Sequence, residues 1–477
     1  MGLEIRPTMS SDSRWSTIGI PNIHPTWVSP LCGILVAAAI FRFVPLARDA
    51  SLMLAITVFC VVLWIKSPVE PWFTALLGIG LIGVAFSPGL ALTGFRSPAT
   101  WLVAVGILVG EASRQSGLAR LVETLARTRM PTAASTDAVA AFRYLLVAFC
   151  LASLALAVLI PSALVRVLIL GPILLSLGDL FTERRAKIGL FLGPLLATFY
   201  GSSGVLTGAL ANIIVTGLVE STTGLSISWT EWLLWAGPVM GIGRVLVVIT
   251  VTYLLYHPRD KGSLAAHERT ENVGVTSQQL RMLAFLLVGV AIWMTDFLHG
   301  LHPLFGALVI ALLAFAPKIG VVDSDAISEA DFSILFFFGA IFAIAAGLQQ
   351  TGFTDLAAEA LLSQLPSDAS LPIVLVFVVV VSQLLTLVME GLAVASVLTP
   401  ILTSFSSSIG IPLVPVAVME AVALNTYFFP YQSAVLVAIL GMGTVDSVEL
   451  TRISSAIAAV SLLFLVPVQI GVFALFF

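Results

Sequence analysis

Two short stretches place polar groups inside apolar runs at matching positions of the chain. Residues 160–174 read Ile-Pro-Ser-Ala-Leu-Val-Arg-Val-Leu-Ile-Leu-Gly-Pro-Ile-Leu, and residues 388–402 read Val-Met-Glu-Gly-Leu-Ala-Val-Ala-Ser-Val-Leu-Thr-Pro-Ile-Leu. When the two are aligned, Ser162 falls on Glu390. In hydrocarbon, irregular backbone survives only where protein or a water-filled cavity satisfies it. Paired breaks of this kind predict a buried binding site of a transporter.

Glu390 is the strongest single candidate for a functional residue, because an ionisable side chain within a membrane segment is a functional candidate by default. Its carboxylate can hold Na⁺, carry a proton, or form a fixed ion pair with Arg166, which lies one helical turn past the first break. Arg166 can equally contact an anionic substrate. Three other charged residues are weaker candidates: Glu420, Asp296 and Arg244. Arg244 has no obvious partner and can either extend its head group to the membrane surface or pair with an acid.

A second polar break follows each stretch about 40 residues later. Hydroxyls and freed carbonyls at such breaks offer the oxygen ligands that hard cations prefer, although small residues can also simply allow close helix packing. Substrate contacts are expected from both stretches and both breaks, namely at Ser162, Ala163, Leu164, Arg166, Ser203, Gly204, Thr207, Glu390, Gly391, Asn425, Pro430, Gln432 and Ser433. Candidate Na⁺ ligands are Ser162, Gly201, Ser202, Thr207, Asn212, Glu390, Asn425 and Thr426.

The composition is that of a polytopic membrane protein. Of 477 residues, 59% are hydrophobic and 10% are charged, and the mean hydropathy is +1.08. Soluble domains carry roughly a quarter charged residues, so a large soluble domain is excluded. We expect an all-α protein with about 11 transmembrane helices and two re-entrant hairpins in inverted repeats. No cleavable signal peptide is visible, and three scattered cysteines form no disulfide framework.

The placement of Lys and Arg predicts the orientation, because these residues gather in cytoplasmic loops. If the loops 113–142 and 257–280 are cytoplasmic, then both flanks of 143–179 are cytoplasmic and this segment is a hairpin that enters from inside. By the same reasoning, 371–406 is a hairpin that enters from outside. Their tips fall at residues 161–164 (the first tip) and 389–392 (the second tip).

The predicted organisation has five parts, of which two are scaffold and two form a transport domain. The two transport units echo each other, as Gln115-Ser116-Gly117-Leu118 and Gln350-Thr351-Gly352-Phe353 show. In order, the parts are a cytoplasmic segment (1–28), scaffold helices (29–112), a first unit (113–222, with hairpin 143–179 and broken helix 187–222), more scaffold (232–348), and a second unit (349–477, with hairpin 371–406, broken helix 413–444 and last helix 453–477).

Over residues 30–477 the chain resembles the divalent anion/sodium symporter family. In that family each hairpin tip carries a Ser-Asn-Thr motif ten residues ahead of a proline, and here Ser162 and Glu390 stand ten residues before Pro172 and Pro400. Only Ser162 remains of the two motifs, which have become Ser-Ala-Leu and Glu-Gly-Leu. The resemblance implies that the tips bind the substrate, that tips and breaks form two sodium sites, and that a homodimeric scaffold carries a moving transport domain.

These observations predict a secondary active transporter in the bacterial inner membrane with a cytoplasmic N-terminus. It would move a small anion, such as a dicarboxylate, sulfate or sulfonate, coupled to Na⁺ by an elevator-type mechanism. The alternatives are a proton-coupled carrier or anion exchanger that uses Glu390, and an anion channel. No catalytic motif is present, so an intramembrane enzyme is not expected. No cofactor beyond the coupling ion and no nucleic-acid partner is expected.

Overall fold

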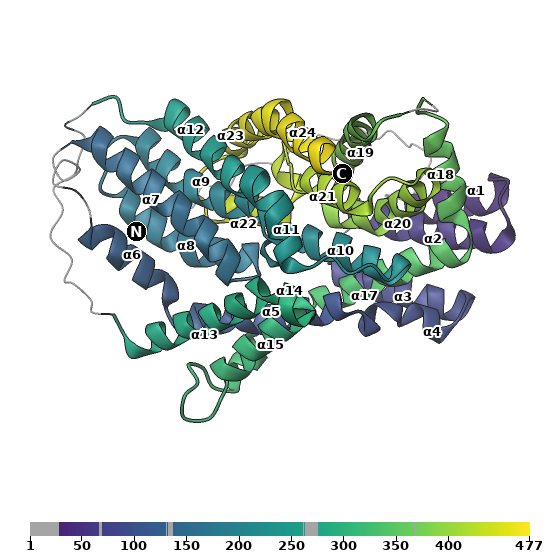
Figure 1. Cartoon of the computed structure of the whole chain (residues 1–477), viewed down its shortest axis with the longest axis horizontal. Coiled ribbons are helices and arrows are strands. Elements are labelled where there is room, and N and C mark those ends of the chain that lie inside the picture. Colours follow the sequence, from purple (N-terminus) through teal and green to yellow (C-terminus); the bar gives the residue numbers. More distant parts are fainter. Residues whose placement is uncertain are drawn as a thin grey trace, which may run out of the picture.

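The chain folds into apolar helices that occur in the same order in its two halves (Figure 1). The computed structural model describes residues 28–65, 69–129, 131, 137–260, 262, 275–366 and 369–477. The predicted cytoplasmic segment 1–28 lies outside the described residues except for its last residue, as does most of the loop 257–280. Nothing described therefore bears on the orientation of the N-terminus.

Helices of the first half lead from an N-terminal group into the first hairpin. The N-terminal group is α1 (Val28–Phe43), α2 (Arg48–Ile65), α3 (Pro71–Ala85), α4 (Pro88–Ala91) and a 3₁₀ turn (Thr93–Arg96). The next helices are α5 (Pro98–Gln115), α6 (Leu118–Thr128), α7 (Ala138–Leu159), α8 (Ala163–Gly178), α9 (Arg184–Tyr200), α10 (Leu210–Thr223), α11 (Trp229–Ala236) and α12 (Arg244–Tyr256).

Four helices connect the halves, and the second half then repeats the first. The connecting helices are α13 (Ser277–Met294), α14 (Asp296–His299), α15 (Pro303–Ala314) and α16 (Asp325–Glu329). The second half is α17 (Ile334–Gln350), α18 (Phe353–Leu362), α19 (Leu371–Thr386), α20 (Gly391–Ile409), α21 (Leu413–Leu424), α22 (Ala434–Gly441), α23 (Ser447–Val460) and α24 (Val466–Phe476).

Matching turns mark the start of the two units. Helices α5 and α17 both end at a glycine in the left-handed conformation, Gly117 with φ 70° and Gly352 with φ 74°. Glycine adopts this conformation without strain, which is why it commonly ends helices. The chain bends by 77° between α17 and α18. The two similar sequence stretches around these glycines therefore form the same turn in both halves.

Both hairpins break where the sequence pattern predicts. Ser162 is the N-cap of α8 and Glu390 is the N-cap of α20, so the two aligned residues hold the same structural position. In each half the hairpin packs against the other half's broken helix: α20 lies against α10, and α8 against α22. Whether the hairpins re-enter on one side of a membrane stays a prediction.

Several predicted boundaries differ from the structure by a few residues, and the first hairpin begins at Ala138 rather than at 143. The last helix begins at Ser447 rather than 453, because Asp446 and Glu449 form a capping box there. The second scaffold region, predicted from residue 232, has its first helix begin at Trp229, where the Ser228 hydroxyl accepts a hydrogen bond from the backbone N–H of Glu231. Both long helices also contain a π-helical segment, at Gly237–Gly243 and Ser461–Leu465, which the sequence analysis did not foresee.

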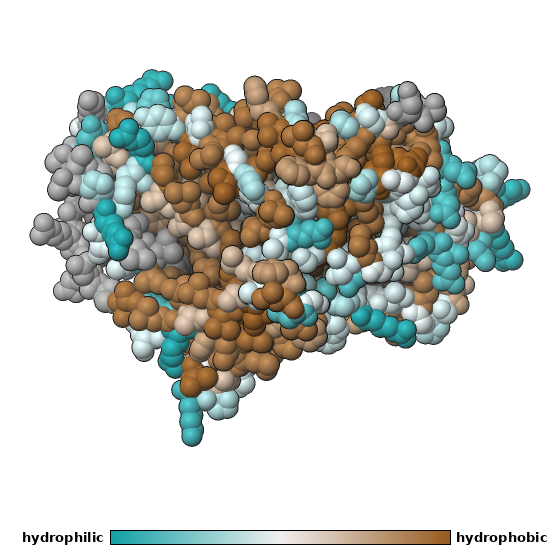
Figure 2. Space-filling model, in the orientation of Figure 1, coloured by the Kyte–Doolittle hydropathy of each residue, from teal (hydrophilic) through white to brown (hydrophobic). Residues whose placement is uncertain are grey.

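The face of the molecule shown in Figure 2 is apolar across much of its middle and more polar at several of its edges. Six described helices are long and apolar enough to cross a membrane, or seven if the bent pair α17 and α18 counts as one span. Further apolar helices among the described residues are shorter, at 10–17 residues. A multi-pass membrane protein is thus supported, whereas the expected number of 11 spans stays a prediction.

Candidate functional site

The first link (residues 201–209) joins α9 to α10 through two short 3₁₀ turns and is fully buried. Its backbone passes very close to the π-helical segment, because a Cβ on Gly204 would lie 2.4 Å from the Cα of Gly241. Ser202 Oγ donates to the carbonyl of Phe199 at 2.6 Å. Thr207 Oγ1 accepts a hydrogen bond from Trp229 Nε1 at 3.1 Å. The hydroxyls predicted as ligands are thus engaged within the protein.

The second link (residues 425–433) joins α21 to α22 through a 3₁₀ turn that starts at Pro430. Gln432 organises it: its Oε1 accepts from the backbone N–H groups of Phe428 and Phe429 at 2.8 Å each, and its Nε2 donates to the carbonyl of Thr386 at 2.7 Å. Ser433 caps α22 by accepting from the N–H of Val435. The second link is therefore tied to the second hairpin just before its tip.

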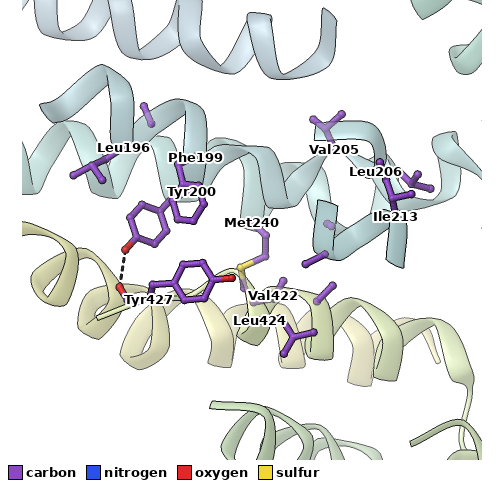
Figure 3. Close-up of a cluster of buried hydrophobic side chains, with 14 of the residues drawn as sticks. Leu196, Phe199, Tyr200, Val205, Leu206, Ile213, Met240, Val422, Leu424 and Tyr427 are labelled. Atoms are coloured by element: carbon purple, nitrogen blue, oxygen red, sulfur yellow. Dashed lines mark hydrogen bonds between the residues drawn. The ribbon is translucent and has the colours of Figure 1, made fainter. Parts of the chain in front are cut away.

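The two links are joined through buried side chains. Asn425 Nδ2 donates to Asn212 Oδ1 at 3.0 Å, and Asn212 Nδ2 donates to the carbonyl of Val205 at 2.9 Å. In Figure 3, Tyr200 from α9 lies beside Tyr427 from the second link, and its hydroxyl donates to the Tyr427 carbonyl at 2.7 Å. The polar breaks of opposite halves thus meet in one buried core.

Arg244, at the start of α12, bridges the same two links. The side chain is 0% exposed. It donates to Ser203 Oγ at 3.0 Å, to the Val422 carbonyl at 3.1 Å, and to Thr426 Oγ1. Both alternatives for Arg244, extension toward the membrane surface and pairing with an acid, are wrong, because neutral oxygens hold the guanidinium in the interior. No local pattern around Arg244 predicts these partners, because the three oxygens lie 41, 178 and 182 residues away along the chain.

Arg166 binds neutral oxygens around the first tip rather than Glu390. Its guanidinium is 0% exposed. It donates to the carbonyls of Ile160 (2.5 Å), Thr198 (3.1 Å) and Gly208 (2.9 Å), and to Thr198 Oγ1 (2.8 Å). The alternative in which Arg166 pairs with Glu390 is therefore wrong for this structure. The guanidinium instead places a positive charge between the first tip and the first link.

Glu390 has a different role from Ser162 at the equivalent position. Its Oε2 accepts from the backbone N–H of Leu392 at 2.9 Å, so a carboxylate caps α20. Ser162 caps α8 with a neutral hydroxyl, which accepts from the N–H of Val165 at 3.3 Å. A helix N-terminus carries a partial positive charge. The carboxylate of Glu390 therefore neutralises the positive N-terminus of α20 at the second tip, whereas the hydroxyl of Ser162 brings no negative charge to the N-terminus of α8 at the first tip.

A cavity of about 570 Å³, the tip cavity, opens beside the first tip. Of the predicted site residues, Ser162 and Leu164 line it, together with apolar residues of α5 and α10. The charged residues that line it are Arg114, Glu111, Glu329 and Asp331, and Arg114 forms ion pairs with Glu111 at 2.6 Å and with Glu329 at 2.7 Å. Sequence analysis missed Glu111 as part of the site. An acid three residues before Arg114, at the end of an apolar span, was the available signal.

Glu420 is another buried acid with a neutral partner. Its Oε1 accepts from Thr399 Oγ1 at 2.8 Å, so α21 and α20 are joined below the second tip. Asp296 accepts from the backbone N–H of Thr230 at 3.1 Å and ties α14 to α11. Neither acid lines the tip cavity. Both residues hold helices together in this structure.

Comparison with known proteins supplies the family. The model of the sodium:sulfate symporter transmembrane region matches residues 26–474. An L-tartrate/succinate antiporter of Escherichia coli is 24% identical over 483 residues, covering 92% of this chain and 96% of its own. A membrane protein of Cupriavidus necator is 26% identical over 328 residues, which are 63% of this chain and 62% of that protein, so the match spans less than two thirds of it.

Two solved structures show the fold alone. The YdaH transporter of Alcanivorax borkumensis superposes with a TM-score of 0.53 at 17% identity, covering 90% of this chain and 99% of that one. MtrF of Neisseria gonorrhoeae, described within a class of antimetabolite efflux pumps, gives a TM-score of 0.53 at 13% identity, covering 93% and 97%. The family match across nearly the whole chain decides the identity. The chain belongs to the sodium:sulfate symporter transmembrane family, the divalent anion/sodium symporters that its sequence resembles, and is a multi-pass transporter of small anions.

Proposed function

We propose that this protein is a secondary carrier that exchanges small carboxylate anions across the bacterial inner membrane, with no Na⁺ bound at its first tip. Its curated relatives in Escherichia coli are named L-tartrate/succinate antiporters, which supports exchange of such anions. The hairpins and broken helices would move as one transport unit against the scaffold. Helices α11 and α12 belong with that unit, because Trp229, Trp232 and Arg244 donate hydrogen bonds to the links.

The observation that carries the proposal is the buried guanidinium of Arg166 at the first tip. The α8 N-terminus has a neutral cap, Ser162, and lines the tip cavity. Arg166 does not itself line the cavity, but its guanidinium and the helix dipole add positive charge at the N-terminus of α8, which favours an anion beside Ser162. An anionic substrate is therefore expected to enter the tip cavity and to approach Ser162 and the first turn of α8.

The same guanidinium disfavours Na⁺ coupling at this tip. Three carbonyl oxygens that could ligate a cation, those of Ile160, Thr198 and Gly208, already accept from Arg166. A Na⁺ ion would need to displace these bonds and would also meet a positive charge in a medium of low dielectric constant. Exchange of one anion for another balances charge without a cation.

Glu390 supports a second candidate, a proton-coupled carrier. Within the described residues no ion pair joins Glu390 to a base. A carboxylate in such a place can bind a proton during the transport cycle. In this version, uptake follows a pH gradient and needs no anion on the opposite side. Glu390→Gln would abolish that pH-driven uptake and leave exchange in place.

Reconstituted vesicles separate these possibilities. Purified protein is placed in vesicles that contain succinate, L-tartrate or no organic anion, and the entry of labelled succinate is followed with Na⁺ or choline outside. The proposal expects rapid entry only into vesicles that contain an anion, at the same rate in both salts. Rapid Na⁺-dependent entry into empty vesicles would contradict it and restore the Na⁺-coupled prediction.

A further inference from the structure

Helices α5 and α10 line two cavities that follow each other along their shared interface. Val103 and Gly106 of α5 and Leu210 of α10 line the tip cavity. Leu102 of α5 lines a second space, of only about 10 Å³, and Ile213 lines both. The interface is therefore wide on the side of the first tip and almost closed on the other.

A contact between a carboxylate and an imidazole lies at the closed end. His302 Nε2 lies 3.6 Å from Glu220 Oε2, and both residues line the small space. His302 also caps α15, because its Nδ1 accepts from the backbone N–H of Leu304 at 3.1 Å. When Nδ1 accepts, Nε2 must carry the hydrogen, so the imidazole presents a donor to the carboxylate. The remaining residues that line this space are apolar or bear hydroxyls.

The contact between Glu220 and His302 joins the two proposed units, the transport unit and the scaffold. The transport unit comprises α7–α12 and α19–α24, and the scaffold comprises α1–α5 and α13–α17. Among the ion pairs between described residues, Arg114 pairs within the scaffold, whereas Arg184–Glu449 and Asp179–Lys187 lie within the transport unit. Glu220 on α10 and His302 at the N-terminus of α15 form the described contact between an acid and a base that crosses from one unit to the other.

We propose that Glu220 and His302 form a latch that closes the pathway on their face and must separate for the transport unit to move. The inference rests on the proposed carrier function. In the present structure the pathway is open beside the first tip, and the latch holds α10 against α15. When the latch parts, the small space lined by Thr216 and Ile213 widens and the opposite cavity closes.

Reversible cross-linking tests the latch. Glu220→Cys and His302→Cys are combined with Cys32→Ser, since Cys60 and Cys150 are buried and Cys32 is exposed. A short bifunctional methanethiosulfonate joins the two new thiols, and intact mass identifies the product. Because the cross-link removes the states in which the units part, anion exchange in vesicles should fall about ten-fold or more and return on reduction. Exchange at the uncross-linked rate in fully cross-linked protein would overturn the latch.

The chain offers a matched control. Asp179→Cys with Lys187→Cys replaces an ion pair of 3.2 Å that lies within the transport unit, so its cross-link should leave exchange unchanged. Each single cysteine variant controls for attachment of the reagent at one end. If the double variant fails to transport before any cross-linking while the wild type does transport, the labelling rate measured with Glu220→Gln, described next, replaces the cross-linking test. If the wild type itself moves no anion, the carrier proposal fails rather than the latch.

A second measurement does not depend on transport. Thr216→Cys, on the wall of the small space, is labelled with a membrane-impermeant maleimide in vesicles, alone and together with Glu220→Gln. Weakening the latch should shift the population toward the opened state and raise the labelling rate several-fold. Equal rates in both variants would mean that the pair does not control access, and would overturn the proposal.

Discussion

Asn425 and Asn212 face each other across the two halves of the chain, with Asn425 Nδ2 donating to Asn212 Oδ1 at 3.0 Å. Asn212 Nδ2 lies within hydrogen-bond distance of three carbonyls of the first link, those of Ser202, Ser203 and Val205. Asn425 Nδ2 also donates to the carbonyl of Ala421 at 2.9 Å. One pair of amides therefore fixes the first link and holds the second beside it.

Replacing Asn212 by Ala should destabilise the protein strongly. The substitution leaves the Val205 carbonyl and the Asn425 amide without their partner in a buried place, which costs about 1–3 kcal/mol for each such group. Asn425→Ala should cost less, because Asn212 keeps its bonds to the first link. Thermal unfolding of the two variants in detergent, followed by tryptophan fluorescence, measures the difference. An Asn212→Ala protein as stable as wild type would show that water replaces the lost bonds.

A second prediction concerns the close approach of the first link to the π-helical segment. A Cβ on Gly204 would lie 2.4 Å from Gly241 Cα and 2.5 Å from Gly241 N, and backbone cannot move aside cheaply. Gly204→Ala should therefore lower both the melting temperature and the exchange rate. Gly80→Ala on α3 is the control, since no atom lies within 4 Å of its added Cβ. That change should be neutral or stabilise by up to about 1 kcal/mol.

The sequence predicted the breaks well because each break is a local event. Pro430, or the run of glycines and hydroxyls from Gly201, weakens helical hydrogen bonding within a few residues of itself, and this effect is visible in one stretch of chain. Ser162 and Glu390 were aligned correctly for the same reason, as the capped starts of α8 and α20 show. Local chemistry of this kind needs no knowledge of the packing.

The partners of the buried charges could not be predicted in this way. A pair between Arg166 and Glu390 was one of two predicted alternatives, because an acid is the usual partner of a base, yet the acceptors of Arg166 are carbonyls and a hydroxyl whose positions depend on the fold. Arg244 meets Thr426 over 182 residues of sequence separation. Hydrophobic runs fix which segments are helical, but they do not fix which polar atoms meet inside a bundle where almost every surface is apolar.

A third prediction concerns stability at low pH, through Glu183 in the loop between α8 and α9. The backbone N–H groups of Asp260 and Arg259 donate to its carboxylate at 2.9 and 3.0 Å and lower its pKa from the ordinary 4.5. Because the folded state lowers this pKa, the stabilisation is complete above the unfolded value and is lost as the pH falls through the folded value.

The melting temperature of wild type should thus fall more steeply below pH 4.5 than that of Glu183→Gln, whose amide oxygen still accepts but does not titrate. If the melting temperatures of the two proteins fall in parallel as the pH is lowered, then this contact does not couple the loop to folding. Other acids titrate in both proteins, so only the difference between the curves carries the test.

The last prediction concerns the internal cation at the first tip. Arg166→Gln removes the positive charge and frees carbonyl oxygens of Ile160, Thr198 and Gly208. Each charged hydrogen bond that is lost should cost about 1.5–3 kcal/mol, so the variant should melt earlier than Arg143→Gln, an exposed control on α7.

Since the freed oxygens can ligate a cation, Na⁺ should raise the melting temperature of Arg166→Gln more than choline does, and should leave the wild type unaffected. Affinity for succinate should fall in the same variant, because the anion loses the nearby charge. If Na⁺ stabilises wild type as much as the variant, then a cation site exists beside Arg166 rather than in place of its guanidinium, and Na⁺ coupling at the first tip becomes the better account.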